Sequence, residues 1–145
     1  MLSRTSEYAM RAAIVIARRE SDGRVPAKTI AAEARVPLKY LHKVLRDLVR
    51  HGVLRSGRGL GGGYVLNQPA ADICLHDIVT PFTEKVGASA CPFGNADCGE
   101  GEPCPVHEKW LPVMVAYRRF LQNTRLADLV ATGGFGAGSA PSLSG

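Results

Sequence analysis

Three cysteines and one histidine lie within residues 91–107, in the segment CPFGNADCGEGEPCPVH. The other residues are mostly Gly, Pro and short polar side chains, which cannot order the chain by burying a hydrophobic core. Order in this segment is therefore expected to come from bonds made by its thiols and its imidazole. Because thiolates are soft metal ligands, the segment predicts a metal site with the candidate ligands Cys91, Cys98, Cys104 and His107.

The spacing of these residues leaves more than one kind of site open. The cysteines follow the pattern C-x6-C-x5-C, and the histidine comes three residues after the last of them. Iron–sulfur clusters and zinc both suit thiolates, although structural zinc sites usually bring ligands in pairs about two to four residues apart. A third interpretation is a reversible disulfide between Cys98 and Cys104, which leaves His107 without a role.

The composition is that of one soluble globular unit. The chain has 145 residues, of which 46% are hydrophobic. No apolar stretch is long enough to span a membrane, and the N-terminus MLSRTSEYAM lacks the apolar run of a secretory signal. We therefore expect a cytoplasmic protein without a membrane partner, a compartment in which clustered cysteines are more often ligands or redox-active thiols than structural disulfides.

Charge is divided unevenly between the two halves of the chain. Residues 1–70 carry 13 Lys and Arg against 5 Asp and Glu, whereas residues 71–145 carry 5 against 8. This asymmetry is typical of a nucleic-acid-binding module joined to a separate sensing or pairing module. An ordinary solvated surface would also account for it, so charge alone does not decide between the two interpretations.

The order of elements in the basic half predicts a winged helix-turn-helix domain over residues 1–69. A first helix is expected from about residue 4 to 19, a short helix opened by Pro26, and a third helix from Pro37 to the glycine at position 52. In the third helix, Leu38, Leu41, Leu45 and Leu48 share one face. The stretches VLRS and YVLN around GRGLGGG then predict a β-hairpin.

In a winged helix-turn-helix, the third helix enters the major groove and the hairpin contacts the DNA backbone or the minor groove. Lys39, Lys43, Arg46 and Arg50 form a basic stripe on the third helix. The glycines of GRGLGGG also resemble a nucleotide-binding loop, but no Lys-Ser/Thr follows and the next residues read as a strand. Double-stranded DNA is therefore the predicted partner, and the expected contacts are Lys28, Lys39, Tyr40, His42, Lys43, Arg46, Arg58, Gly59 and Gly61.

The second half of the chain divides into four predicted parts. Residues 70–90 contain a connecting helix and a linker, in which Cys74 reads as a small core residue. Residues 91–107 form the cysteine-rich loop, residues 108–131 a long helix, and residues 132–145 a flexible Gly/Ser-rich tail. The long helix is expected to kink at Pro112 or to start near it. It carries an apolar stripe, which predicts a dimer interface made of Trp110, Met114, Tyr117 and Leu121.

A helix-turn-helix followed by RGLGGGYVL, three cysteines, CPVHEKW and a helix ending NTRLADLV resembles the iron–sulfur transcription regulators of the IscR, NsrR and RirA type. The similarity runs from residue 1 to about residue 131. It implies a homodimer whose long helices pair and whose three cysteines hold a 2Fe-2S or 4Fe-4S cluster. Zinc stays the alternative metal on the chemistry of the ligands alone. Some members of this family supply a carboxylate ligand from the first helix to the partner's cluster. That resemblance adds Glu7 to His107 as a candidate fourth ligand.

The combined interpretation is a mainly α-helical, DNA-binding transcription regulator with a small β-wing, expected to act as a repressor. Its operator binding would be controlled by a cluster that senses redox state, nitric oxide or iron and cluster status. We expect no enzymatic activity, because no set of nucleophile, base and oxyanion donors is recognisable. The competing interpretations are a zinc-stabilised or thiol-switched DNA-binding regulator and a cluster-bearing redox carrier, which would need neither the basic helix nor the wing.

Overall fold

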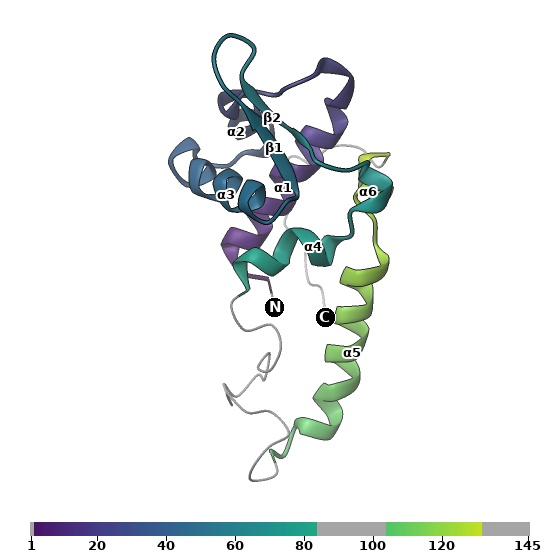
Figure 1. The fold of residues 1–145 in the computed structure, drawn as a ribbon. Helices are drawn as coiled ribbons and strands as arrows, with labels where there is room; N and C mark the ends of the chain where they lie inside the picture. The colour runs from purple at the N-terminus through teal and green to yellow at the C-terminus, as the bar shows by residue number, and fades with distance from the viewer. Residues whose placement is uncertain (1, 84–103, 132–145) are drawn as a thin grey trace.

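The first helix, α1 (Arg4–Arg18), forms the centre of the protein in the computed structural model, which describes residues 2–83 and 104–131. Its N-cap is Ser3, whose hydroxyl accepts a hydrogen bond of 3.1 Å from the backbone N–H of Ser6. Small and aliphatic residues from Ala9 to Ala17 bury most of the helix. Four other helices pack against α1: α2 (Ala27–Ala34), α3 (Leu38–Arg50), α4 (Leu75–Val79) and α6 (Leu126–Val130) (Figure 1).

The helix-turn-helix follows after a short 3-10 helix, η1 (Glu20–Asp22). It consists of α2 (Ala27–Ala34) and α3 (Leu38–Arg50), joined by a tight turn in which Arg35 adopts a left-handed conformation with φ 55°. The backbone N–H of Val36 closes this turn on the carbonyl of Ala31 at 3.0 Å. The predicted apolar face of α3 is confirmed at Leu41, Leu45 and Leu48, which are fully buried.

The wing is a two-stranded antiparallel sheet of β1 (Leu54–Gly57) and β2 (Gly63–Leu66), which confirms the predicted hairpin. Leu54 pairs with Leu66 at the base, and the loop between the strands projects beyond the helices (Figure 1). Val25 adds an isolated bridge to Tyr64, with hydrogen bonds of 3.0 and 2.9 Å in the two directions. This bridge fixes the wing to the segment that leads into α2.

The connecting region contains η2 (Ala70–Asp72), α4 (Leu75–Val79) and η3 (Thr80–Phe82). Two helices then occupy the place of the single helix expected over residues 108–131, so that expectation is wrong. α5 (His107–Asn123) ends before α6 (Leu126–Val130) begins. The break is made by backbone pairing, because the N–H of Leu75 donates to the carbonyl of Thr124 at 3.0 Å and the N–H of Leu126 donates to the carbonyl of Ile73 at 2.8 Å.

Helix α5 extends away from the rest of the protein, and its first residues lie at the far end (Figure 1). It begins at His107 and continues through Pro112, so it does not start near that proline. Its side chains are exposed or half-buried up to Phe120, and Leu121 is its one buried residue. No helix among the described residues has the length and apolar content needed to cross a membrane.

Candidate nucleic-acid interface and cysteine segment

The outward face of α3 is basic and open to solvent. Lys39, His42, Lys43 and Arg46 are all exposed, as predicted from the position of the leucines on the opposite face. Tyr40 is 55% exposed beside them, and the ammonium of Lys39 lies 5.6 Å from the centre of its ring. This face therefore presents cations and one aromatic ring to solvent.

The positive charge of this face is not neutralised by acidic side chains. Across residues 2–83 and 104–131, Lys39, Lys43 and Arg46 take part in none of the ion pairs. At the end of the helix, Arg50 approaches Asp47 at 3.9 Å. An uncompensated row of cations along one exposed helix is the arrangement that binds the phosphates of a duplex.

The remaining predicted DNA contacts lie on α2 and on the wing. Lys28 is exposed in the first turn of α2. Arg58, Gly59 and Gly61 are exposed in the loop between the strands, where both glycines have φ 81° and the N–H of Gly62 donates to the carbonyl of Gly59 at 2.9 Å. A side chain at either glycine would be strained, so the tight loop that carries Arg58 depends on them.

The chain is similar to known proteins in both sequence and fold. Residues 2–132 match the Rrf2 family, which is described as an iron-dependent transcriptional regulator. The chain belongs to the Rrf2 family. The transcriptional regulator IscR of Yersinia enterocolitica is 33% identical over 129 residues, which cover 89% of this chain and 78% of that protein. IscR of Serratia proteamaculans gives the same identity over the same length.

Solved structures agree with this assignment. CymR, the global cysteine regulator of B. subtilis, superimposes with a TM-score of 0.76 at 25% identity, over 90% of this chain and 96% of its own. The oxidised form of CymR from Staphylococcus aureus gives 0.72 at 28% identity, over 93% and 99%. This Rrf2 protein is therefore a DNA-binding transcription regulator with a winged helix-turn-helix.

Two of the four predicted ligands in the cysteine segment lie within the described residues. Cys104 is half-buried and free, and its carbonyl accepts a 3.0 Å hydrogen bond from the N–H of His107, the first residue of α5. Cys91 and Cys98 lie outside the described residues. Within residues 2–83 and 104–131 of the Rrf2 chain, no three His, Cys, Asp or Glu residues gather into a group that could hold a metal ion.

Glu7, the candidate ligand on α1, is engaged within its own helix. Its carboxylate accepts a hydrogen bond from the guanidinium of Arg11 at 2.5 Å, one turn further along. The Glu7 side chain is 47% exposed, so it remains accessible from outside the chain. Among residues 2–83 and 104–131, Glu7 and Cys104 belong to no group of three or more potential metal ligands.

Cys74 has the core position that the sequence predicts. It is 8% exposed at the N-cap of α4, and its thiol donates a hydrogen bond of 3.1 Å to a carboxylate oxygen of Asp77. Burial, together with the neighbouring carboxylate, raises the pKa of the Cys74 thiol. The protonated form of this cysteine is thus favoured, which makes it a poor metal ligand.

The predicted apolar stripe of α5 divides between two environments. Trp110, Met114 and Tyr117 are half-buried, whereas Leu121 is 1% exposed and packs in the core of its own chain. Leu121 was expected at the dimer interface, and its burial leaves it no surface for a partner. The other faces of α5 expose four more large apolar side chains, Leu111, Val113, Val115 and Phe120, at 43% to 51%.

Residues of α1 that were not predicted as DNA contacts share a cleft with α3. Arg4 and Tyr8 line this cleft together with Lys39, Tyr40 and Lys43. One signal was available in the sequence, since a cation in the first turn of a helix opposes the helix dipole. Arg4 breaks that rule, and such local conflicts concentrate at functional sites.

Proposed function

We propose that this Rrf2 regulator holds an iron–sulfur cluster on Cys91, Cys98 and Cys104, and that the state of this cluster sets its affinity for operator DNA. The observation that carries the proposal is the position of Cys104. Its thiol is free and lies just before the exposed helix α5. The same chain carries basic side chains on α3 that form no ion pairs with acidic side chains of residues 2–83 and 104–131. The printed family description and the IscR relatives support the choice of iron.

The donor set fits such a group. Three thiolates in a segment rich in Gly and Pro can turn toward one point, and thiolates are the usual ligands of iron–sulfur clusters. A bound cluster would supply a group sensitive to oxidants, nitric oxide and iron supply. Cys74, which is buried and hydrogen-bonded to Asp77, takes no part in this set.

The DNA contacts of the proposal lie on three elements. Lys39, Tyr40, His42, Lys43 and Arg46 of α3 would face the major groove, with Lys28 of α2 near the adjacent backbone. Arg58 would reach the backbone or the minor groove from the wing, where Gly59 and Gly61 leave the loop small enough to approach closely. The exposure of all six charged and aromatic side chains on α3 and the wing supports this assignment.

We further propose that α5 pairs with α5 of a second copy. Trp110, Met114 and Tyr117 form a half-buried stripe, and the buried Nε1 of Trp110 and hydroxyl of Tyr117 have no hydrogen-bond partner among the described residues. A soluble helix with exposed apolar side chains on its other faces needs a partner to cover them. A dimer would also present two copies of α3 to a two-fold symmetric operator.

Within one chain, α5 and α6 provide a connection from the cysteine segment to the DNA-binding half. Cys104 precedes the far end of α5, and the near end is anchored by the buried Leu121. From there α6 packs against α1, and α1 packs against α3. A change in the position of α5 would therefore be transmitted through packed side chains to α3, the helix proposed to enter the major groove.

Replacing Cys104 with alanine is expected to abolish the visible absorption of anaerobically purified protein. Two thiolates would leave a cluster with too few protein ligands to be retained. The matched control is Cys74→Ala, which removes the buried thiol and is expected to keep the wild-type spectrum and iron content. A colourless wild-type protein with stoichiometric zinc would contradict the proposal, as would a wild-type protein that holds a Cys98–Cys104 disulfide and no iron.

The fourth ligand is expected to be His107, since the first turn of α5 places it one turn beyond Cys104. His107→Ala should therefore shift the cluster spectrum and accelerate cluster loss, measured anaerobically beside operator affinity. Glu7→Ala should leave the spectrum unchanged, because Glu7 is held by Arg11. A perturbed spectrum in Glu7→Ala with a wild-type spectrum in His107→Ala would reverse the assignment and make Glu7 a ligand supplied across the dimer.

A further inference from the structure

A cleft of 470 Å³ lies between the first turns of α1 and the N-terminal half of α3. Its lining includes the cations Arg4, Lys39 and Lys43 and the aromatic rings of Tyr8 and Tyr40. Among residues 2–83 and 104–131, no acidic side chain lines it. Three cationic residues and two tyrosines that line one cleft make it a candidate site for an anion.

The cations of the cleft have no acidic partner in the described part of the chain. Arg4, Lys39 and Lys43 are absent from every ion pair formed by residues 2–83 and 104–131. Glu7, the acid of α1 that follows Arg4, is already paired with Arg11. The mutual repulsion of three like charges is therefore uncompensated until an anion enters.

The position of the cleft indicates which anion. Lys39 and Lys43 belong both to the cleft and to the exposed basic face of α3. A duplex that contacts Lys39 and Lys43 on this face would bring its sugar-phosphate backbone close to the cleft, because the same two lysines line it. We propose that the cleft binds one backbone phosphate of the operator, with Arg4 as the contact from α1. This inference rests on the proposed contact of α3 with DNA and adds α1 to the DNA interface.

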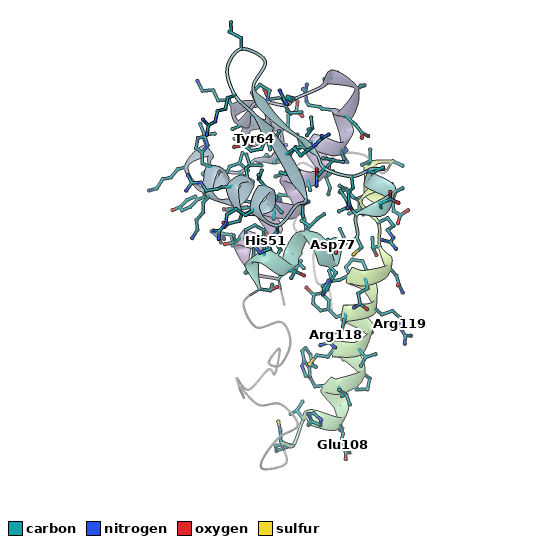
Figure 2. All side chains as sticks on the ribbon, viewed as in Figure 1. His51, Tyr64, Asp77, Glu108, Arg118 and Arg119 are labelled. Atoms are coloured by element: carbon teal, nitrogen blue, oxygen red, sulfur yellow. The ribbon has the colours of Figure 1, made fainter. Side chains whose placement is uncertain are left out.

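The test compares Arg4→Ala with Arg119→Ala in the full-length protein. Both remove one exposed arginine, but Arg119 lies on α5 and points away from the rest of the protein (Figure 2). For Arg4→Ala, the slope of log affinity against log salt should become shallower by about 0.9, the value for one phosphate contact. Arg119→Ala should keep the wild-type slope, and Arg4→Lys should restore most of it, because a phosphate contact needs only a cation at that place.

A phosphate contact should also contribute equally to the binding of any DNA sequence. Arg4→Ala should weaken binding to a selected operator fragment and to unrelated duplex DNA by similar factors, because the phosphate carries no sequence information. Hydroxyl-radical footprinting should show that protection is lost at one backbone position in each half-site. An unchanged salt slope and an unchanged footprint in Arg4→Ala, with wild-type protein binding normally, would overturn the inference and leave the proposed function intact.

Two other outcomes separate the possible sources of the phosphate. Inorganic phosphate is titrated into wild-type protein and Arg4→Ala without DNA, at ionic strength matched with chloride. Saturable binding that is lost in Arg4→Ala, combined with an unchanged DNA salt slope, would assign the cleft to a free anion and overturn the proposal. If wild-type protein shows no salt-dependent affinity for DNA at all, the proposed function fails together with the inference.

Discussion

Replacing Gly63 with alanine is expected to lower the free energy of unfolding by about 3 to 4 kcal/mol, from backbone strain plus the loss of paired hydrogen bonds. Gly63 has φ 145°, and a Cβ built on it would lie 2.4 Å from the carbonyl oxygen of Val25. The obstructing atom is backbone, so it cannot move aside as a flexible side chain would. Relief of the clash would separate Val25 from Tyr64 and release the wing from the segment before α2.

The matched control is Gly52→Ala. Gly52 also has a positive φ, 78°, but nothing lies within 4 Å of a Cβ at that position. Alanine at position 52 should lower the free energy of unfolding by only roughly 1 kcal/mol, the cost of holding a residue with a Cβ in a left-handed conformation. Urea-induced unfolding at a fixed protein concentration measures both variants, and equal midpoints for the two would contradict the importance of the Val25 contact.

The second large effect is expected for Leu126→Ala, at about 3 to 5 kcal/mol of lost stability, the range for a large aliphatic side chain removed from a rigid core. Leu126 is 0% exposed, and its helix α6 packs directly on α1. Its backbone N–H is held by the carbonyl of Ile73 at 2.8 Å, so α6 cannot shift easily to fill the cavity. The variant should therefore unfold at a clearly lower urea concentration than the wild type.

Leu60→Ala removes the same atoms from a place where they contact nothing. Leu60 is fully exposed at the tip of the wing, so its truncation should change stability by less than about 0.5 kcal/mol. Comparison of the two leucine variants separates burial from side-chain chemistry. If Leu126→Ala were as stable as Leu60→Ala, α6 would not be part of the core.

The helix-turn-helix and the wing were predictable because local patterns determine them. Leu41, Leu45 and Leu48 repeat with helical spacing, and one buried face places Lys39 and Lys43 on the opposite, exposed face. The hairpin was predictable because two short apolar stretches flank a glycine-rich loop, and strand-like stretches on either side of such a loop indicate a β-hairpin.

Features that depend on residues far apart in the sequence could not be predicted in this way. The end of α5 is set by pairing between Cys74 and Arg125, which no local period encodes. Arg4 and Lys43 line one cleft, and that arrangement exists only once α1 has packed on α3. The ligand set in the cysteine segment stays a prediction from spacing and resemblance, because Cys91 and Cys98 lie outside the described residues.

The pairing of residues 73–75 with residues 124–126 also determines when a newly made chain can finish folding. Leu121 and Leu126 are fully buried, and they cover apolar surface of elements that leave the ribosome much earlier, among them α1 and α4. That surface stays uncovered until the late residues have been synthesised, and closing the long loop between the two segments costs entropy before its contacts form. The complete DNA-binding half is therefore expected to form only after the cysteine segment has been translated, because Leu121 and Leu126 follow that segment in the chain.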